Sequence, residues 1–232
     1  MTNTTSNQPL QGQVVIVTGA AGALGRAVAD RFSLLGARVA QLDVIAISND
    51  HYCDTCDLTD AAAVQSAVAR IVRELGAVNI VANIAGGFAM GETVHETKAE
   101  TWDFLMGLNA SSVLNMARAA VPHMLEQGAG KFVNVGAGPG QRGAALMGAY
   151  AASKSVVIRL TETMAEELKE QGINVNCVLP SIIDTERNRS DMPDADFSRW
   201  VTPEAMARVV SFLASADADP IHGAAIPVTG LS

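Results

Sequence analysis

The sequence VVIVTGAAGALGRAVADRFSLLGARVAQLD, residues 14–43, contains the pattern on which the predicted fold depends. β-branched residues typical of a buried strand lead into a glycine-rich turn, an amphipathic helix follows, and a second strand ends at Asp43. These parts follow one another within about thirty residues, in the order that a dinucleotide site requires. The stretch predicts an α/β unit that binds a dinucleotide; the simpler alternative is a glycine turn in an unrelated α/β unit.

The glycine-rich turn supplies the backbone freedom that a phosphate site needs. Gly19, Gly22 and Gly25 let the backbone turn and approach a pyrophosphate, which rests on the amides at the start of the following helix. These amides belong to the residues around Ala23 and Leu24. The turn therefore predicts the phosphate end of the site.

The acid at the end of the second strand indicates which dinucleotide binds. Asp43 can accept hydrogen bonds from an adenosine ribose diol and would repel a 2′-phosphate, and no basic residue follows at Val44 or Ile45. The sequence therefore predicts NAD(H) in preference to NADP(H). In the alternative interpretation, Asp43 only caps a turn.

The rest of the chain continues the alternation of strands and helices. Further strands are expected at about 52–56, 78–83, 131–135, 173–179 and 224–228. Helices are expected after Asp60, over about 97–127 in two segments, from the region of Tyr150 to near Gly172, and after Thr202. The pattern predicts a doubly wound, mostly parallel seven-stranded sheet with helices on both faces, a Rossmann fold. Residues 1–232 are expected to form one domain, with a flexible N-terminus over about 1–12 and a substrate-covering loop over about 181–201.

Composition narrows the class of protein. The chain has 232 residues and a formal net charge of −8, which argues against nucleic acid or an anionic membrane as a main partner. No apolar run reaches membrane-spanning length, and the first residues lack the features of a signal peptide. We expect a soluble cytoplasmic protein with a small-molecule substrate.

The cysteines and histidines give no strong signal. Cys53 and Cys56 form a Cys-x-x-Cys, but a redox pair or zinc site needs a helix N-terminus or four ligands, and this stretch supplies neither. No metal site is expected. His95, His123 and His222 show no partner spacing and are interpreted as surface residues.

A second stretch, residues 131–154, has two candidate catalytic side chains on a predicted helix. Its sequence is KFVNVGAGPGQRGAALMGAYAASK. Tyr150 and Lys154 are one helical turn apart and share a face. An ammonium beside a phenol favours the phenolate, which predicts a lowered pKa for Tyr150. No Ser or Thr occurs between Lys131 and Ala149.

Together these motifs resemble the short-chain dehydrogenase/reductase family over essentially the whole chain. Tyr150 and Lys154 match its catalytic pair, and Asn109 falls where the family has an Asn that helps to hold a proton-relay water; it is also interpretable as a helix–helix contact. Asp57 resembles the adenine-contacting acid, with a helix cap as its alternative. The resemblance implies cofactor contacts at Gly19, Gly22, Ala23, Leu24, Gly25, Asp43, Asp57, Leu58, Asn83, Ala85, Gly86, Lys154, Pro180, Ile183 and Thr185.

Several positions depart from the family pattern. Ala23 replaces the middle glycine of the cofactor loop, Ile84 replaces an Asn after Asn83, and Ser181 replaces the Gly after Pro180. The family's catalytic Ser corresponds to Ala137, whose side chain has no hydroxyl to polarise a substrate carbonyl. Gln141 is a possible substitute donor.

Ala137 and the cofactor loop resemble one branch of the family, the dihydropteridine reductases. The segment 179–200 and Phe88 resemble that branch too, whereas Asn109 belongs to the general family. The leading hypothesis is an NADH-dependent reductase of an electron-poor substrate such as a quinonoid dihydropteridine, with Tyr150 as proton donor. The first alternative is an NAD(P)-dependent carbonyl reductase or alcohol dehydrogenase, and the second is a catalytically idle cofactor-binding protein, supported only by Ala137.

Apolar residues near the catalytic pair have two interpretations. Met and aromatic side chains are more often core, but here they are also candidates to line a substrate pocket. The substrate candidates are Phe88, Ala137, Gln141, Met147 and Met192. The resemblance further implies a homodimer or homotetramer that pairs through the helices around 109–126 and 149–171.

Overall fold

Seven strands form one sheet in the computed structural model, which describes residues 8–232. The strands are β1 Val14–Thr18, β2 Arg38–Asp43, β3 Tyr52–Thr55, β4 Ile80–Asn83, β5 Gly130–Val135, β6 Ile173–Pro180 and β7 Ala225–Val228. Their order is β3-β2-β1-β4-β5-β6-β7, and every neighbouring pair is parallel. The chain crosses from one side of β1 to the other between β3 and β4. The predicted doubly wound Rossmann architecture is confirmed.

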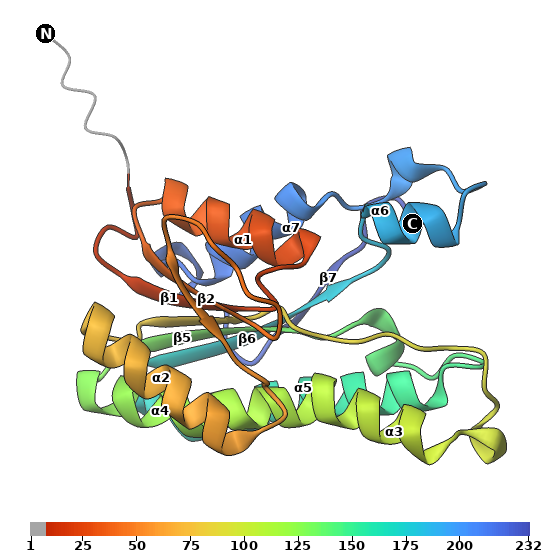
Figure 1. Ribbon diagram of the computed structural model, residues 1–232, viewed down its shortest axis with the longest axis horizontal. Coiled ribbons are helices and arrows are strands. Elements are labelled where there is room, and N and C mark those ends of the chain that lie inside the picture. Colours follow the sequence, from red (N-terminus) through yellow and green to blue (C-terminus); the bar gives the residue numbers. More distant parts are fainter. Residues whose placement is uncertain (1–7) are drawn as a thin grey trace, which may run out of the picture.

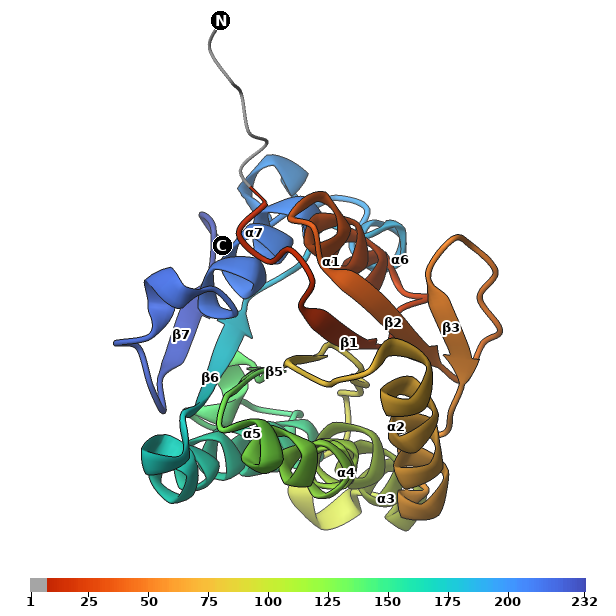
Figure 2. The ribbon, with the colours of Figure 1, turned by 90° about the vertical axis from the view of Figure 1, so that its left-hand side faces the viewer.

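Helices cover both faces of the sheet, as Figure 2 shows. One face packs against α1 and α7, and the other packs against α2, α4 and α5. β1 is fully buried along its length. Because helices cover both faces of the sheet, such a strand has a near-continuous apolar sequence. The helices are α1 Ala23–Leu34, α2 Ala61–Leu75, α3 Ala99–Leu105, α4 Ser112–Gln127, α5 Gly148–Leu168, α6 Glu186–Asp191 and α7 Pro203–Leu213.

Two helix starts follow the capping rules used in the prediction. The Asp60 carboxylate accepts hydrogen bonds from the amides of Ala62 and Ala63 at the start of α2. The Thr202 hydroxyl accepts from the Ala205 amide at the start of α7, with proline at the first helical position. These short-range signals were sufficient to position both helices.

The helical run predicted over 97–127 differs in its interior. α3 and α4 are joined without a break by a π-helical turn, Met106–Ser111, which contains Asn109. A π-helical turn inserts an extra residue into the helix and is frequent at functional sites. Where the sequence predicts a boundary between two helical segments, the structure instead has a π-helical turn that locally widens one continuous helix.

Parts of the two segments predicted to be a flexible N-terminus and a substrate-covering loop are ordered. Residues 1–7 lie outside the described part; after them, Leu10 is buried and its amide donates to the Leu35 carbonyl. The stretch 181–201 contains α6 and a short helical turn at Phe197–Arg199. That this stretch covers a substrate stays a prediction.

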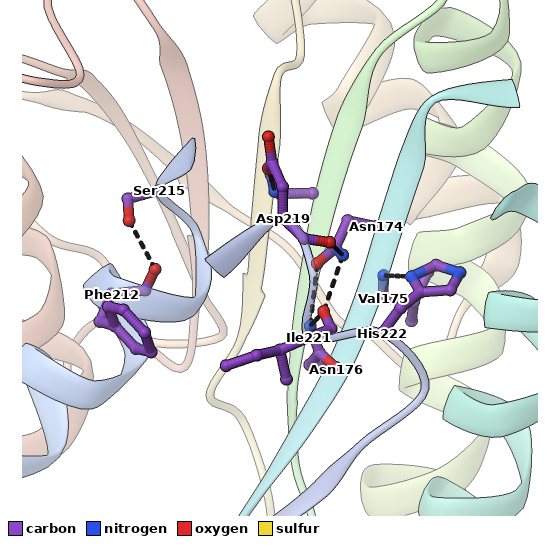
Figure 3. Close-up of polar contacts among 9 residues, drawn as sticks. Asn174, Val175, Asn176, Phe212, Ser215, Asp219, Ile221 and His222 are labelled. Atoms are coloured by element: carbon purple, nitrogen blue, oxygen red, sulfur yellow. Dashed lines mark hydrogen bonds and ion pairs between the residues drawn. The ribbon is translucent and has the colours of Figure 1, made fainter. Parts of the chain in front are cut away.

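Polar side chains attach the loop before β7 to β6, as Figure 3 shows. Asn174 and Asn176 both donate from their side-chain amides to the Ile221 carbonyl, at 2.8 and 2.7 Å. His222, expected at the surface, is half-buried: its Nδ1 accepts from the Val175 amide, and its Nε2 lies 2.8 Å from the Ala165 carbonyl oxygen. It joins α5 to β6, a contact that sequence spacing does not reveal.

The described chain has no helix that combines the length and the apolar character of a membrane span. Among residues 8–232, no group of three or more His, Cys, Asp and Glu side chains is arranged to hold a metal ion. Cys53 and Cys56 are free thiols; Cys56 is buried, which raises its pKa to about 11.

Candidate active site

Three loops meet at the carboxyl edge of the sheet, where parallel strands β1, β4 and β5 all end (Figure 1). The Thr18 hydroxyl, at the end of β1, accepts hydrogen bonds from the amides of Ile84 and Ala85, at 3.0 and 3.1 Å. This side chain ties the loop after β4 to the glycine-rich loop. Ala85 and Gly86 therefore lie beside the predicted phosphate site.

The glycines of the first loop are required by close approach. Gly19 has φ +64°, and a Cβ there would lie 2.8 Å from the Ala85 Cα. A Cβ on Gly25 would lie 2.1 Å from the Gly19 carbonyl oxygen. The loop is thus folded tightly against both α1 and the neighbouring loop, and larger residues would open it.

The start of α1 is available to an anion. Gly22 is the N-cap residue, is exposed, and offers no side-chain cap to the first amides of the helix. Those amides include Ala23 and Leu24, which by position have no partner inside the helix. Ala23 opens α1 without crowding the loop. The arrangement fits a pyrophosphate.

Asp43 lies at the end of β2, next to this loop. Its Oδ2 accepts from the Ala21 amide at 2.9 Å, and its Oδ1 accepts from the Ile45 amide at 3.0 Å. The carboxylate is thereby held in a fixed orientation, with acceptor capacity left on both oxygens. Val44 and Ile45 beside it are exposed and apolar.

Asp57 and Leu58 follow β3 at the same edge. Asp57 is exposed and accepts from both the amide and the hydroxyl of Thr59, which lowers its pKa. Leu58 packs its side chain into the core. Asp60, rather than Asp57, caps α2.

Tyr150 and Lys154 lie on the first turns of α5, against the ends of β4 and β5. Lys154 is buried, and its Nζ donates to the Val135 carbonyl at 2.8 Å. Gly86 lies close enough that a Cβ there would be 3.2 Å from this Nζ. The Tyr150 ring meets the exposed Phe88 ring edge to face, with centroids 4.9 Å apart.

The pKa of Tyr150 differs from the sequence expectation. Burial of the phenol raises its pKa to about 12, opposite to the lowered value predicted from the sequence. Burial also lowers the pKa of Lys154 to about 8. The Lys154 ammonium donates to the Val135 carbonyl.

Asn109 is buried and faces the loop after β4. Its Oδ1 accepts from the Gly87 amide at 2.8 Å and its Nδ2 donates to the Gly87 carbonyl at 3.0 Å. The same Nδ2 donates to the Ser153 hydroxyl, which in turn donates to the Tyr150 carbonyl. Ser153 was not among the predicted residues; its position before Lys154 on the catalytic helix was the available signal.

Of the remaining predicted cofactor residues, Asn83 lies inside the core, and Pro180 and Ile183 lie at and just after the end of β6. The Asn83 side chain donates to Asn134 at 2.8 Å, and Asn134 donates to Thr161 on α5, so Asn83 is engaged inside the core. Pro180 ends β6, and the Ile183 carbonyl accepts from the Asn188 side chain.

Thr185 caps the start of α6: its hydroxyl accepts from the Asn188 amide. Its own hydroxyl proton remains available to a ligand. Thr185 therefore has a structural role that is compatible with the predicted cofactor contact.

The predicted substrate residues are spread around the catalytic helix. Ala137 is buried in extended backbone at the end of β5, whereas Gln141 is exposed. Met147 borders a cavity of about 230 Å³ beside the start of α5. Met192 is half-buried at the end of α6. The cavity is lined by Ala89, Met90, Glu92, Thr97, Thr101, Leu146, Met147, Gly148 and Ala149.

Comparison with known families identifies this arrangement. The model of the short-chain dehydrogenase family matches residues 13–196. The chain belongs to this family. As a short-chain dehydrogenase it is an oxidoreductase with an NAD(P)(H) site, and the corresponding predictions are confirmed.

Relatives of this short-chain dehydrogenase act on alcohols, polyols and ketones by name. It is 33% identical to cyclohexanol dehydrogenase from Rhodococcus sp., covering 97% of this chain and 98% of that protein. It is 32% identical to D-threitol dehydrogenase from Mycolicibacterium smegmatis, covering 95% and 93%. It is 30% identical to the 3-oxoacyl-(acyl-carrier-protein) reductase FabG of Vibrio cholerae, covering 95% and 97%.

A solved structure supports the same family assignment. Aldohexose dehydrogenase from Thermoplasma acidophilum superposes with a TM-score of 0.89 at 26% identity, covering 97% of this chain and 96% of that one. These relatives favour alcohol and carbonyl chemistry, which was the first alternative in the sequence analysis. The leading dihydropteridine hypothesis gains no support from them. Ala137 and the 179–200 segment, on which that hypothesis was based, are its only support.

Proposed function

We propose that this short-chain dehydrogenase interconverts a small secondary alcohol and its ketone with NAD(H) in preference to NADP(H). The observation that carries the proposal is the placement of Tyr150 and buried Lys154 at the carboxyl edge of the sheet, beside the glycine loop. The relatives named as cyclohexanol and D-threitol dehydrogenases support this class of substrate.

The residues at the carboxyl edge fit a nicotinamide dinucleotide. The uncapped start of α1 receives the pyrophosphate, and Asp43 receives the adenosine ribose hydroxyls while opposing a 2′-phosphate. When bound, the dinucleotide supplies or accepts the hydride. Lys154, held by the Val135 carbonyl next to Gly86, is placed to donate to a ribose hydroxyl.

Tyr150 handles the proton at its phenolic oxygen. With its pKa raised to about 12, the phenol is protonated at neutral pH and is therefore ready to donate to the oxygen of a ketone as charge develops there. In the alcohol-oxidising direction the same oxygen must first lose its proton.

Ala137 narrows the substrate class. A hydroxyl there would polarise the carbonyl, and losing one such donor costs on the order of a hundredfold in rate. Gln141, the substitute donor suggested by the sequence, is exposed. We therefore infer a ketone already activated by an electron-withdrawing neighbour, such as a second carbonyl or a hydroxyl on the adjacent carbon.

The test is NADH oxidation with a matched panel of ketones. Diketones and hydroxyketones are expected to turn over at least about tenfold faster than simple cyclic ketones, with NADPH a poorer donor. Tyr150→Phe should abolish turnover while leaving NADH binding in place. Turnover of quinonoid dihydropterin alone, with no ketone reduced, would overturn the proposal and restore the pteridine hypothesis.

Assembly belongs to the same proposal. Leu114 and Leu125 on α4 are exposed apolar side chains, so this face suits a homodimer or homotetramer contact. Size-exclusion chromatography with light scattering tests it, and a monomer at micromolar concentration would contradict it.

A further inference from the structure

We infer that Ser181 is a positioning residue, which anchors the segment 181–201 to the residues that follow β7 and so holds Ile183 and Thr185 in place for the cofactor. The part of this inference that concerns the cofactor rests on the proposed function. Ser181 stands where the family resemblance predicts a glycine, so the anchor is a property of this chain's own sequence.

The Ser181 side chain makes two contacts that a glycine cannot make. Its hydroxyl donates to the Thr229 carbonyl at 2.8 Å and lies 2.7 Å from the Ser232 hydroxyl. Its backbone amide donates to the Val228 carbonyl at 3.2 Å, extending the pairing of β6 with β7. Ser181 thus joins the start of the segment to the chain beyond β7.

The end of the segment is joined to the same residues. The Leu231 amide donates to the Arg199 carbonyl at 3.0 Å, and the Arg199 guanidinium donates to the Leu231 carbonyl. Gly230 has φ +60°, and a Cβ there would lie 2.9 Å from the Arg199 carbonyl oxygen. Residues 229–232 therefore bind both ends of the 181–201 segment.

Contacts inside the segment transmit this restraint. Ile183 pairs with Val201 in an isolated parallel bridge, and the Asp184 amide donates to the Val201 carbonyl. Arg189 binds Asp184 through two nitrogens, at 2.5 and 2.7 Å, and its guanidinium lies over the Phe197 ring. With its two ends held together, the segment is a closed loop that carries α6 as a unit.

Limited proteolysis measures the anchor directly, because α6 carries the exposed trypsin sites Arg187 and Arg189. Cleavage there tracks local opening when reclosing is fast. Ser181→Ala should speed cleavage at these two sites about tenfold, the effect of losing two modest hydrogen bonds. Ser181→Thr, which keeps the hydroxyl, should restore slow cleavage.

The matched control is Ser66→Ala, which removes an exposed hydroxyl from α2, away from the segment, and should leave cleavage unchanged. Arg199→Ala tests the other end of the segment and should also speed cleavage. Wild-type cleavage rates in both Ser181→Ala and Arg199→Ala would overturn the anchor.

Kinetics test the positioning role. Ser181→Ala should raise the KM for NADH several-fold while kcat stays within about twofold, with rescue by Ser181→Thr. An unchanged KM for NADH beside faster cleavage would overturn the positioning role. Failure of the proposed function is distinguishable, since the wild-type protein itself would then reduce no ketone of the panel or show no NADH binding in a fluorescence titration, whereas the cleavage rates of the variants would still measure the anchor.

Discussion

Asn109 Nδ2 lies 2.9 Å from Ser153 Oγ, so the π-helical turn is bonded to the helix that carries Tyr150 and Lys154. Asn109 also exchanges two hydrogen bonds with the backbone of Gly87, one residue before Phe88. Because the Phe88 ring packs on the Tyr150 ring, the buried Asn109 amide holds the surroundings of Tyr150, the proposed proton donor, on two sides.

Ser153→Ala removes the link between Asn109 and the catalytic helix. We expect kcat to fall about tenfold, because the loop at Gly87 and helix α5 are then no longer held together through Asn109. The free energy of unfolding should fall by about 1–2 kcal/mol. Steady-state kinetics and urea denaturation measure the two effects. The control is Ser211→Ala on α7, which removes a buried hydroxyl far from the site and should cost stability alone. A wild-type kcat in Ser153→Ala would contradict the linkage.

Lys154 should make stability depend on pH. Its pKa is lowered to about 8 in the folded protein, so between pH 8 and its ordinary value the unfolded chain binds the extra proton and folding gains as pH rises. The gain approaches about 3 kcal/mol at most. It is measured as the difference between wild type and Lys154→Met in urea denaturation from pH 7 to 10. The Cys56 thiol, whose pKa burial raises, acts oppositely in both proteins and cancels. The Cys177 thiol is coupled to Lys154, so the comparison is made in a Cys177→Ala background. A difference that stays flat across this range would contradict the buried ammonium.

Gly25→Ala should destroy the cofactor loop. The added Cβ would lie 2.1 Å from the Gly19 carbonyl oxygen, so backbone must move and the loop must leave α1. We expect NADH affinity to fall at least about a hundredfold and stability to fall by about 2 kcal/mol or more. Gly143→Ala is the control, because a Cβ there has no neighbour within 4 Å. Equal NADH binding by the two variants would show that the loop is not the phosphate site.

Asp43→Asn removes the charge and keeps one of the two backbone hydrogen bonds. The single amide oxygen can accept from the Ala21 amide, the bond from the Ile45 amide is lost, and the repulsion of a 2′-phosphate is gone. The ratio of kcat/KM for NADH to that for NADPH should fall by about tenfold, mainly through improved use of NADPH. An unchanged ratio would show that Asp43 does not determine the preference between NADH and NADPH.

The fold was predictable because its signals are short-range. Glycine spacing at Gly19 to Gly25 and the caps at Asp60 and Thr202 act within a few residues. The π-helical turn was not predictable, because Asn109 is held by Gly87 and Ser153, which are distant in sequence.

The candidate site was predicted as a set of residues but not as a set of contacts. Tyr150 and Lys154 were identified, yet the direction of the Lys154 ammonium depends on the Val135 carbonyl, and the pKa of Tyr150 depends on burial. Both are properties of packing that helical spacing does not contain. The same applies to Ser181, whose partners lie about fifty residues away in sequence.

Ala137→Ser restores the hydroxyl that the family resemblance predicts before the tyrosine. Ala137 is buried beside the start of the 138–140 turn, so a serine there adds one donor without adding bulk beyond an oxygen. If the enzyme reduces ketones, the new donor stabilises the developing alkoxide, and kcat for an unactivated cyclic ketone should rise at least about tenfold. Activated ketones should gain less, because they depend less on that donor. Ala137→Cys, whose thiol is close in size to the hydroxyl but is a much weaker donor, is the control and should give little gain. Unchanged or lower ketone turnover in Ala137→Ser would show that the substrate oxygen does not lie at this position.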